Sequence, residues 1–259
     1  MSGLALRAVP ATEDGQQTLS RADALLDLRR RLTVQAPARE VAPPLPTSVA
    51  ALDAALAGGL PRGKLVEIAG GAGKLAFALL SLAAATQRGE LCALIDVEDA
   101  LDIEAATRVG VTLDRLLWVR PRAADGDRPP EQVSGQGRDD ALGDGLKALD
   151  LVLAAGGFGL VVLYLGGAAT GCRRNPMPGG TWSRLVQRAE KAGAAVLIVS
   201  DDAISGSFSV ATLRCVAGDA VWQRVPGGRW LLQGQQTAIE VARSRLSAPG
   251  DAVALRLRR

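Results

Sequence analysis

From about residue 47 onward, continuous apolar runs alternate with segments whose apolar residues recur at helical spacing. The runs of strand length are 64–69, 91–97, 160–165 and 195–200, with a shorter one at 116–119. The segments with helical spacing are 47–56, 74–87, 103–109 and 182–192, together with the stripe Leu142, Leu146, Leu149 and Leu153. Strands that are apolar along their whole length belong to sheets covered on both faces. The alternation therefore predicts an α/β fold with a mainly parallel central sheet flanked by helices.

The pattern changes after residue 210. Short segments with strand character follow one another through turn residues at 220–224, 229–233, 237–243 and 252–257. Such spacing is typical of antiparallel strands, which we expect to complete the sheet at its C-terminal end. The stretches 121–140 and 166–180 are rich in Gly, Pro and polar residues and are predicted to be surface loops.

The first 46 residues differ from this core. Residues 1–19 show no periodic pattern and are predicted to form a disordered tail. Residues 20–34 are predicted to form an amphipathic helix, because Leu25, Leu28 and Leu32 recur at helical spacing. Residues 35–46 contain four prolines and are predicted to be an extended linker, so the core would span 47–259. The leucine stripe of the helix could pack on its own core or dock on another chain.

Composition limits the chemistry. The chain has no histidine, which excludes histidine-based catalysis and histidine-ligated metal sites. Cys92, Cys172 and Cys215 are far apart in sequence, so we expect buried thiols in a reducing compartment. No apolar run has transmembrane length, and no signal peptide is visible, so we expect a cytoplasmic protein without a membrane partner. The net charge of +3 permits contact with nucleic acid without predicting it.

A glycine-rich turn between the first strand and the following helix is the main candidate for chemistry. Gly70, Gly71, Gly73 and Lys74 stand where a P-loop would hold phosphates. The turn departs from the P-loop pattern, because the first glycine is missing and Leu75 has no hydroxyl group for magnesium. We therefore expect a degenerate nucleotide site that is too short to wrap a phosphate, with no bound ATP or magnesium and no metal site.

Several patches in the same order resemble RecA: residues 52–68, 92–102, 110–117 and 243–249. The resemblance implies a RecA-like P-loop core, and we expect it to lack the C-terminal domain of RecA. It places Glu98 at the catalytic glutamate, Tyr164 at the Walker B aspartate and Asp201 at the glutamine that senses the γ-phosphate. Because Tyr164 cannot position a metal as a carboxylate does, these replacements imply that the protein is not an enzyme.

A RecA-like core with a lost ATP site resembles the ImuA family of accessory proteins in bacterial SOS mutagenesis. The resemblance implies a non-catalytic adaptor in SOS-induced translesion synthesis. Its implied partners are an ImuB-type inactive Y-family polymerase homologue and, indirectly, an error-prone replicative-type DNA polymerase. RecA or a second copy of the chain stay open as further partners.

In RecA filaments the N-terminal helix docks on the neighbouring core. The resemblance therefore implies an acceptor groove lined by Leu146, Leu149 and Leu153. The alternative is that this stripe packs on the chain's own sheet.

Two other functions stay open from the sequence. One is an active RecA-like DNA-dependent ATPase or recombinase, and the other is a SulA-like inhibitor of cell division. Single-stranded DNA is a further candidate partner, because a set of arginines could form a basic track with Trp182 available for stacking. These arginines are Arg173, Arg174, Arg214, Arg243 and Arg245. The alternative is that they are solvated surface residues.

Overall fold

The computed structural model describes residues 42–121, 135–167, 179–246 and 253–258. The predicted tail 1–19, the predicted helix 20–34 with Leu25, Leu28 and Leu32, and residues 35–41 of the predicted linker lie outside the described residues.

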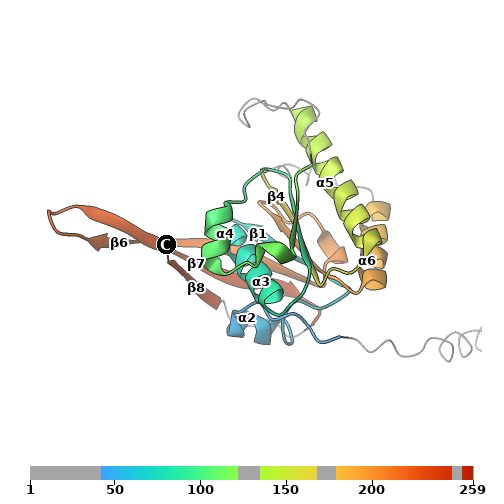
Figure 1. Ribbon diagram of the computed structural model, residues 1–259, viewed down its shortest axis with the longest axis horizontal. Coiled ribbons are helices and arrows are strands. Elements are labelled where there is room, and N and C mark those ends of the chain that lie inside the picture. The colour runs from blue at the N-terminus through green and yellow to red at the C-terminus, as the bar shows by residue number, and fades with distance from the viewer. Residues whose placement is uncertain (1–41, 122–134, 168–178, 247–252, 259) are drawn as a thin grey trace, which may run out of the picture. The chain divides into compact units, whose positions relative to one another are not determined.

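The core is built on an eight-stranded sheet with the order β3-β2-β4-β5-β1-β6-β7-β8 (Figure 1). The strands are β1 (Leu65–Gly70), β2 (Cys92–Asp96), β3 (Leu116–Val119), β4 (Leu160–Gly166), β5 (Ala195–Ser200), β6 (Ala211–Arg224), β7 (Trp230–Ser244) and β8 (Val253–Arg258). Pairing is parallel from β3 to β6 and antiparallel between β6, β7 and β8. This arrangement confirms the predicted fold class.

Helices cover both faces of the parallel part of the sheet (Figure 1). They are α2 (Ala50–Ala55), α3 (Lys74–Gln87), α4 (Ile103–Val109), α5 (Gly135–Ala155) and α6 (Gly179–Ala192), and short 3₁₀ turns lie at Leu113–Arg115 and Gly206–Phe208. In the described part of the chain, no helix is both long and apolar enough to span a bilayer.

Three predictions about element boundaries were wrong. The predicted loop 121–140 ends early, because α5 already begins at Gly135. The C-terminal segments 229–233 and 237–243 form one continuous strand, β7, and the segment 220–224 is the end of a strand that begins at Ala211. Irregular pairing between Ala217 and Ala220 and next to Val221 absorbs the residues that resemble turns, as β-bulges commonly do.

Strand residues alternate between two hydrophobic cores. In β4, Leu160 and Val162 face the core formed with α2, α3 and α4, whereas Val161, Leu163 and Leu165 face the core formed with α5 and α6. This period of two is the geometry of an extended strand, and it explains why the parallel strands have no polar face.

The leucine stripe of α5 belongs to the second core. Leu146, Leu149 and Leu153 are 3%, 0% and 3% exposed, and they pack with residues of β2 and β4. Their assignment to a partner-binding groove is therefore wrong, because a groove-lining side chain must reach solvent. Trp182 is likewise buried, at 2% exposure, so it cannot serve as a stacking platform.

The chain enters the core slightly before the predicted start. Leu45 is buried and forms an antiparallel bridge with Leu60. Gly59, at φ +128°, lies so close to the Leu45 carbonyl group that any side chain at this position would collide with it. A second contact secures the following turn, because the Thr47 backbone N–H and hydroxyl group both donate to Asp53 Oδ1 at 2.8 Å.

One carboxylate is fully buried in the central strand. Glu67 is 0% exposed. Its Oε1 accepts hydrogen bonds from the backbone N–H groups of Ile204 at 2.7 Å and Ser205 at 3.0 Å, and its Oε2 accepts one from the Ser205 hydroxyl at 2.7 Å. Glu67 thus attaches the segment that follows β5 to β1, about 137 positions earlier in the chain.

We expect Glu67→Ala to lower the free energy of unfolding by about 3 kcal/mol, because it leaves buried donors unsatisfied. Urea denaturation followed by circular dichroism measures this change. The matched control is Glu190→Ala, which removes an exposed ion pair with Lys64 and should cost less than about 1 kcal/mol. Equal effects of the two substitutions would contradict a structural role for Glu67.

Candidate functional site

The glycine turn joins the end of β1 to the start of α3. The Gly70 N–H donates to the Asp201 carbonyl at 3.0 Å, and the Gly71 N–H donates to the Cys215 carbonyl at 3.2 Å. Gly73 is the N-cap of α3 in a left-handed conformation, with φ +109°. The first amides of the turn are therefore bonded to the flanking strands, which leaves them unable to face a ligand in this conformation.

The C-terminal hairpin β6–β7 packs directly behind this turn. The Thr237 hydroxyl donates to the Ala72 carbonyl at 2.8 Å, and a Cβ atom added at Gly73 would lie 2.7 Å from the Thr237 side chain. A Cβ atom at Gly70 would collide with the Cys215 carbonyl group. Gly70 thus allows a close approach of the Cys215 backbone and Gly73 that of the Thr237 side chain, which is a packing role in addition to any contact with phosphate.

Lys74 is held by an internal ion pair. Its Nζ lies 2.6 Å from Asp201 Oδ1 and donates to the Gly70 carbonyl at 3.1 Å. The Lys74 side chain is 13% exposed and that of Asp201 is 45% exposed. The resemblance indicated that Asp201 lies near the phosphate position, but the pairing with Lys74 was not predicted. The strand order could have predicted this pairing, since β1 and β5 are neighbours in the sheet.

Tyr164 stands at the end of β4, between β2 and β5. Burial and the neighbouring carboxylates Glu98, Asp201 and Asp96 raise its pKa from 10.0 to about 12. The phenol therefore stays neutral over the physiological pH range. A neutral phenol offers a hydroxyl group but not the negative oxygen that hard cations prefer.

Glu98 follows β2 on the same edge of the sheet. Its side chain is exposed, and its carboxylate lies against Gly166, where a Cβ atom would collide with it. The structure therefore brings together four predicted positions at one edge: Lys74, Glu98, Tyr164 and Asp201. Among the described residues, no group of three or more Asp, Glu, Cys or His side chains could hold a metal ion.

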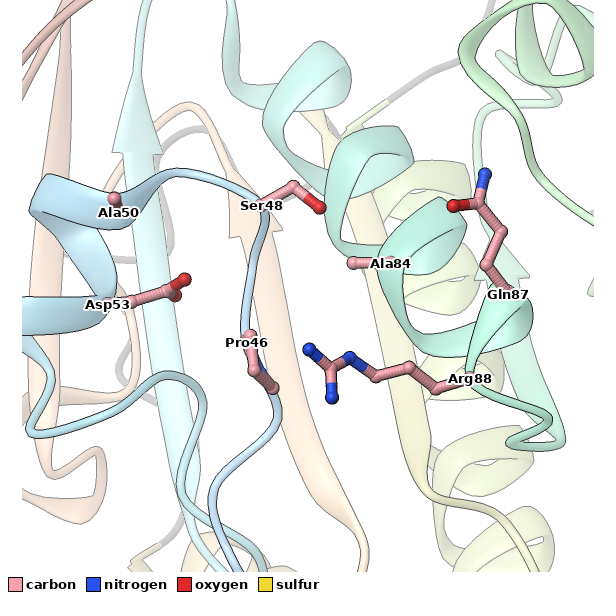
Figure 2. Close-up of a pocket in the computed structure, with 7 residues that line it drawn as sticks. All are labelled: Pro46, Ser48, Ala50, Asp53, Ala84, Gln87 and Arg88. Carbon is pink, nitrogen blue, oxygen red and sulfur yellow. The ribbon is translucent and has the colours of Figure 1, made fainter.

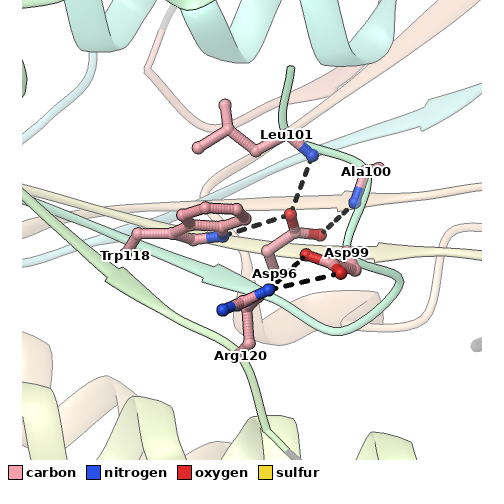
Figure 3. A network of polar contacts seen from close by, with 6 residues as sticks. All are labelled: Asp96, Asp99, Ala100, Leu101, Trp118 and Arg120. Atoms are coloured by element: carbon pink, nitrogen blue, oxygen red, sulfur yellow. Dashed lines mark hydrogen bonds and ion pairs between the residues drawn. The ribbon is translucent and has the colours of Figure 1, made fainter. Parts of the chain in front are cut away.

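Asp96 has a structural role next to this edge (Figure 3). It is 2% exposed and accepts hydrogen bonds from the backbone N–H of Ala100 at 3.0 Å, from that of Leu101 at 2.9 Å and from Trp118 Nε1 at 3.3 Å. Beside it, the Arg120 guanidinium lies 4.6 Å from the centre of the Trp118 ring. Asp96 thus fixes the turn that carries Glu98.

The predicted basic track is not supported for two of its members. The Arg243 guanidinium donates to the Ser209 carbonyl at 3.0 Å and to the Ser209 hydroxyl at 2.8 Å. Arg245 also donates to the Ser209 carbonyl, at 3.3 Å, and to the carbonyl of Ser207. Both side chains thus hold the segment before β6, which gives them a structural role, and their assignment as DNA contacts stays a prediction. Arg214 is exposed on β6, whereas Arg173 and Arg174 lie outside the described residues.

A pocket of 430 Å³ lies away from the glycine turn (Figure 2). It is lined by Pro46, Ser48, Ala50, Asp53, Ala84, Gln87 and Arg88. Arg88 and Asp53 extend from opposite sides toward Pro46 (Figure 2). Because Ala84 and Arg88 lie about 15 and 21 Å along α3 from Lys74, this pocket is separate from the candidate nucleotide site.

Comparison with known proteins supports a RecA relationship. Residues 31–129 match the RecA N-terminal domain. Protein RecA of Cutibacterium acnes is 50% identical over 80 residues, which are 30% of this chain and 23% of that protein. Protein RecA of Kineococcus radiotolerans is 41% identical over 120 residues, which are 44% of this chain and 34% of that protein. The aligned part of the chain thus spans only about a quarter to a third of these relatives.

The fold extends this likeness beyond the aligned sequence. The crystal structure of the RadB recombinase superimposes with a TM-score of 0.55 and 17% identity, covering 82% of this chain and 95% of the RadB chain. The fold defines an α/β protein with a RecA/RadB-like core. The sequence matches place it more narrowly, as a RecA-like protein.

We predict that Tyr164→Phe flattens the loss of stability at alkaline pH. The folded state holds the phenol proton up to about pH 12, whereas the unfolded chain releases it near pH 10. This contribution is therefore fully present below about pH 10 and is lost as the pH rises toward 12, by at most about 3 kcal/mol. Urea midpoints measured at about pH 9 and pH 11.5 should differ less in the variant than in the wild type. An equal fall would contradict the raised pKa.

Proposed function

We propose that this chain is a non-catalytic RecA-like adaptor of the ImuA type that acts in SOS-induced translesion synthesis. Its partner would be an ImuB-type inactive Y-family polymerase homologue, through which it would reach an error-prone replicative-type DNA polymerase. The observation that carries the proposal is the ion pair between Lys74 and Asp201, at 2.6 Å. It supports the interpretation that the Asp201 carboxylate takes the place beside Lys74 that a bound phosphate would occupy.

Electrostatics support this interpretation. The lysine of a working P-loop reaches the β- and γ-phosphates, so an incoming triphosphate must displace the Asp201 carboxylate or lie beside it. Two like charges 4 Å apart repel by about 1–4 kcal/mol, depending on the effective dielectric constant. Since Asp201 is 45% exposed, the lower end of this range is the appropriate one. The repulsion adds to the missing hydroxyl at Leu75 and the neutral phenol at Tyr164.

The nearby carboxylates do not offset these losses. Glu98 and Asp201 both influence the Tyr164 hydroxyl, so two carboxylates lie near the ammonium group of Lys74 at this edge. Such an edge favours cations over phosphates, yet no described cluster is arranged to hold a metal ion. The scaffold is thus better suited to binding a partner than to phosphoryl transfer.

Magnesium-ATP is expected to leave the melting temperature unchanged. A site with a Kd of about 10 μM would stabilise the folded state by about 2.7 kcal/mol at about 1 mM ligand, which is roughly 5–10 °C for a chain of this size. Thermal unfolding with and without nucleotide makes the measurement, with a catalytically active RecA as the positive control. A rise of several degrees would instead support the active ATPase or recombinase.

A matched variant tests whether the Asp201 carboxylate prevents phosphate from binding. Asp201→Asn removes the internal carboxylate and should bind inorganic tripolyphosphate more tightly than the wild type, whereas Asp201→Asn combined with Lys74→Ala should not. Equal binding by the wild type and Asp201→Asn would show that the ion pair does not control access of phosphate to the turn.

The adaptor role itself predicts a nucleotide-independent complex. We expect the full chain to bind an ImuB-type protein from the same genome, with an affinity that Lys74→Ala and Glu98→Gln leave unchanged, because neither side chain would take part in the contact. Isothermal titration calorimetry measures it with and without magnesium-ATP. No binding, or binding that needs ATP and Lys74, would contradict the proposal. Elongated cells on overexpression would favour the SulA-like alternative.

A further inference from the structure

The end of the β6–β7 hairpin distant from the core is a two-stranded ribbon. β1 pairs with β6 only along Ala211–Cys215, and β8 pairs with β7 only along Gly234–Ile239. Beyond these ranges, within the described residues, the strands pair only with each other, up to Arg224 and Trp230. The ribbon extends away from the helices (Figure 1). Isolated two-stranded ribbons are at best marginally stable in water.

This ribbon exposes large apolar side chains. Trp222 is 55% exposed and Trp230 is 63% exposed. Leu232, which pairs with Trp222, is 38% exposed. Leu231 and Val221, which alternate with the tryptophans along the two strands, are 51% and 36% exposed. Single exposed apolar residues are normal on protein surfaces, but a contiguous group marks an interaction site. Tryptophan is also the residue type most enriched at the energetic centres of interfaces.

The strand register places both indoles on one face. Trp222 is opposite Leu232, and Arg224 is opposite Trp230. Directly paired residues share a face, and so do residues two positions apart. We call the face formed by Trp222, Arg224, Trp230 and Leu232 the tryptophan face. On the other face, the Gln233 amide donates to Gln223 Oε1, so that side is partly polar.

The charges near the tryptophan face limit which kind of molecule could bind there. Arg224 and Arg229 flank the turn of the ribbon, and both are exposed. No carboxylate of the described residues forms an ion pair with either of them. A second copy docked through the same face would bring the arginines of both copies together, which is unfavourable. Single-stranded nucleic acid would stack on the indoles but would leave Leu232, on the same face, without an apolar partner.

We propose that the tryptophan face is the docking site for an apolar, acidic segment of a partner protein. Apolar side chains of the segment would cover Trp222, Trp230 and Leu232, and its carboxylates would pair with Arg224 on the same face and with Arg229 at the turn of the ribbon. The inference rests on the proposed adaptor function for its setting, because an adaptor needs such a surface. The argument for the surface itself uses only the exposure, register and charge of the hairpin.

A pair of synthetic peptides tests the surface without assuming the partner. Fluorescence anisotropy is measured with a labelled peptide that alternates Leu and Asp and with a matched peptide that alternates Leu and Lys, each added to the full chain. The Leu–Asp peptide should bind at least about tenfold more tightly, since two close charge pairs differ in sign. Trp222→Ser with Trp230→Ser should weaken its binding at least about tenfold. Arg224→Glu with Arg229→Glu should reverse the preference between the peptides.

The control is Leu151→Ser, which alters a side chain that is 70% exposed on α5 and should change nothing. Thermal unfolding confirms that each variant folds. Equal binding of both peptides, or no effect of the tryptophan substitutions in folded protein, would overturn the inference. So would an oligo-dT complex or a self-associated dimer that the same substitutions abolish, because either would identify a different occupant.

The ImuB-type protein separates this inference from the proposed function. If it binds the wild type and the tryptophan variant equally well, the docking surface is wrong and the adaptor role stands. If it binds neither while the peptides behave as expected, the surface stands and the proposed partner is wrong. A loss of at least about tenfold in the tryptophan variant alone supports both.

Discussion

The parallel pairing of β1 with both β5 and β6 fixes the groups around the glycine turn. Ala69 lies opposite Ser200 of β5, and Gly70 lies opposite Cys215 of β6. The residue that follows β5 must therefore lie beside the glycine turn, which places Asp201 within reach of Lys74. The same pairing brings the start of the C-terminal hairpin behind the turn. The buried carboxylate of Glu67 reinforces this geometry, because it attaches the connection between β5 and β6 to β1.

Charge decides whether the sheet edge beside the glycine turn can bind a phosphate. A phosphate cradle gathers N–H donors and cations around a vacant space, but here the first amides of the turn donate to neighbouring carbonyl groups and the ammonium group meets a carboxylate. Burial and nearby carboxylates also raise the pKa of Tyr164 to about 12, so this position offers no negative oxygen. Each feature has an ordinary structural explanation taken alone. Their coincidence at one sheet edge is what supports an adaptor over an ATPase.

The sequence predicted the parts that depend on local periodicity. Strands such as 160–165 are apolar on both faces, so their place in a covered parallel sheet could be inferred from the apolar run alone. What a leucine stripe packs against could not be predicted in this way. Leu146, Leu149 and Leu153 have the same spacing whether they face a sheet or another protein. Likewise, Gly218 and Gly234 resemble turns in sequence, but strand pairing beyond them keeps β6 and β7 continuous.

Contacts between distant segments were harder still to predict. The pairing of Lys74 with Asp201 follows from the order of strands in the sheet, and Arg243 is bonded to Ser209 only because β7 lies beside the start of β6. The exposed tryptophans show the same limit, because apolar residues in a strand are normally expected to be buried. Only the extent of pairing with β1 and β8 reveals that this part of the hairpin is uncovered.

The two ends of the hairpin have different environments, and this difference bears on how an adaptor could work. The end near the core supports the glycine turn through Cys215 and Thr237, whereas the distant end carries the tryptophan face. From Cys215 to Trp222 the extended chain spans about 23 Å at about 3.3 Å per residue. A segment docked on Trp222 and Trp230 would therefore not contact Lys74. If a partner docks there as proposed, its contact would be separate from the glycine turn, so loss of phosphate binding at the turn would leave the distant surface intact.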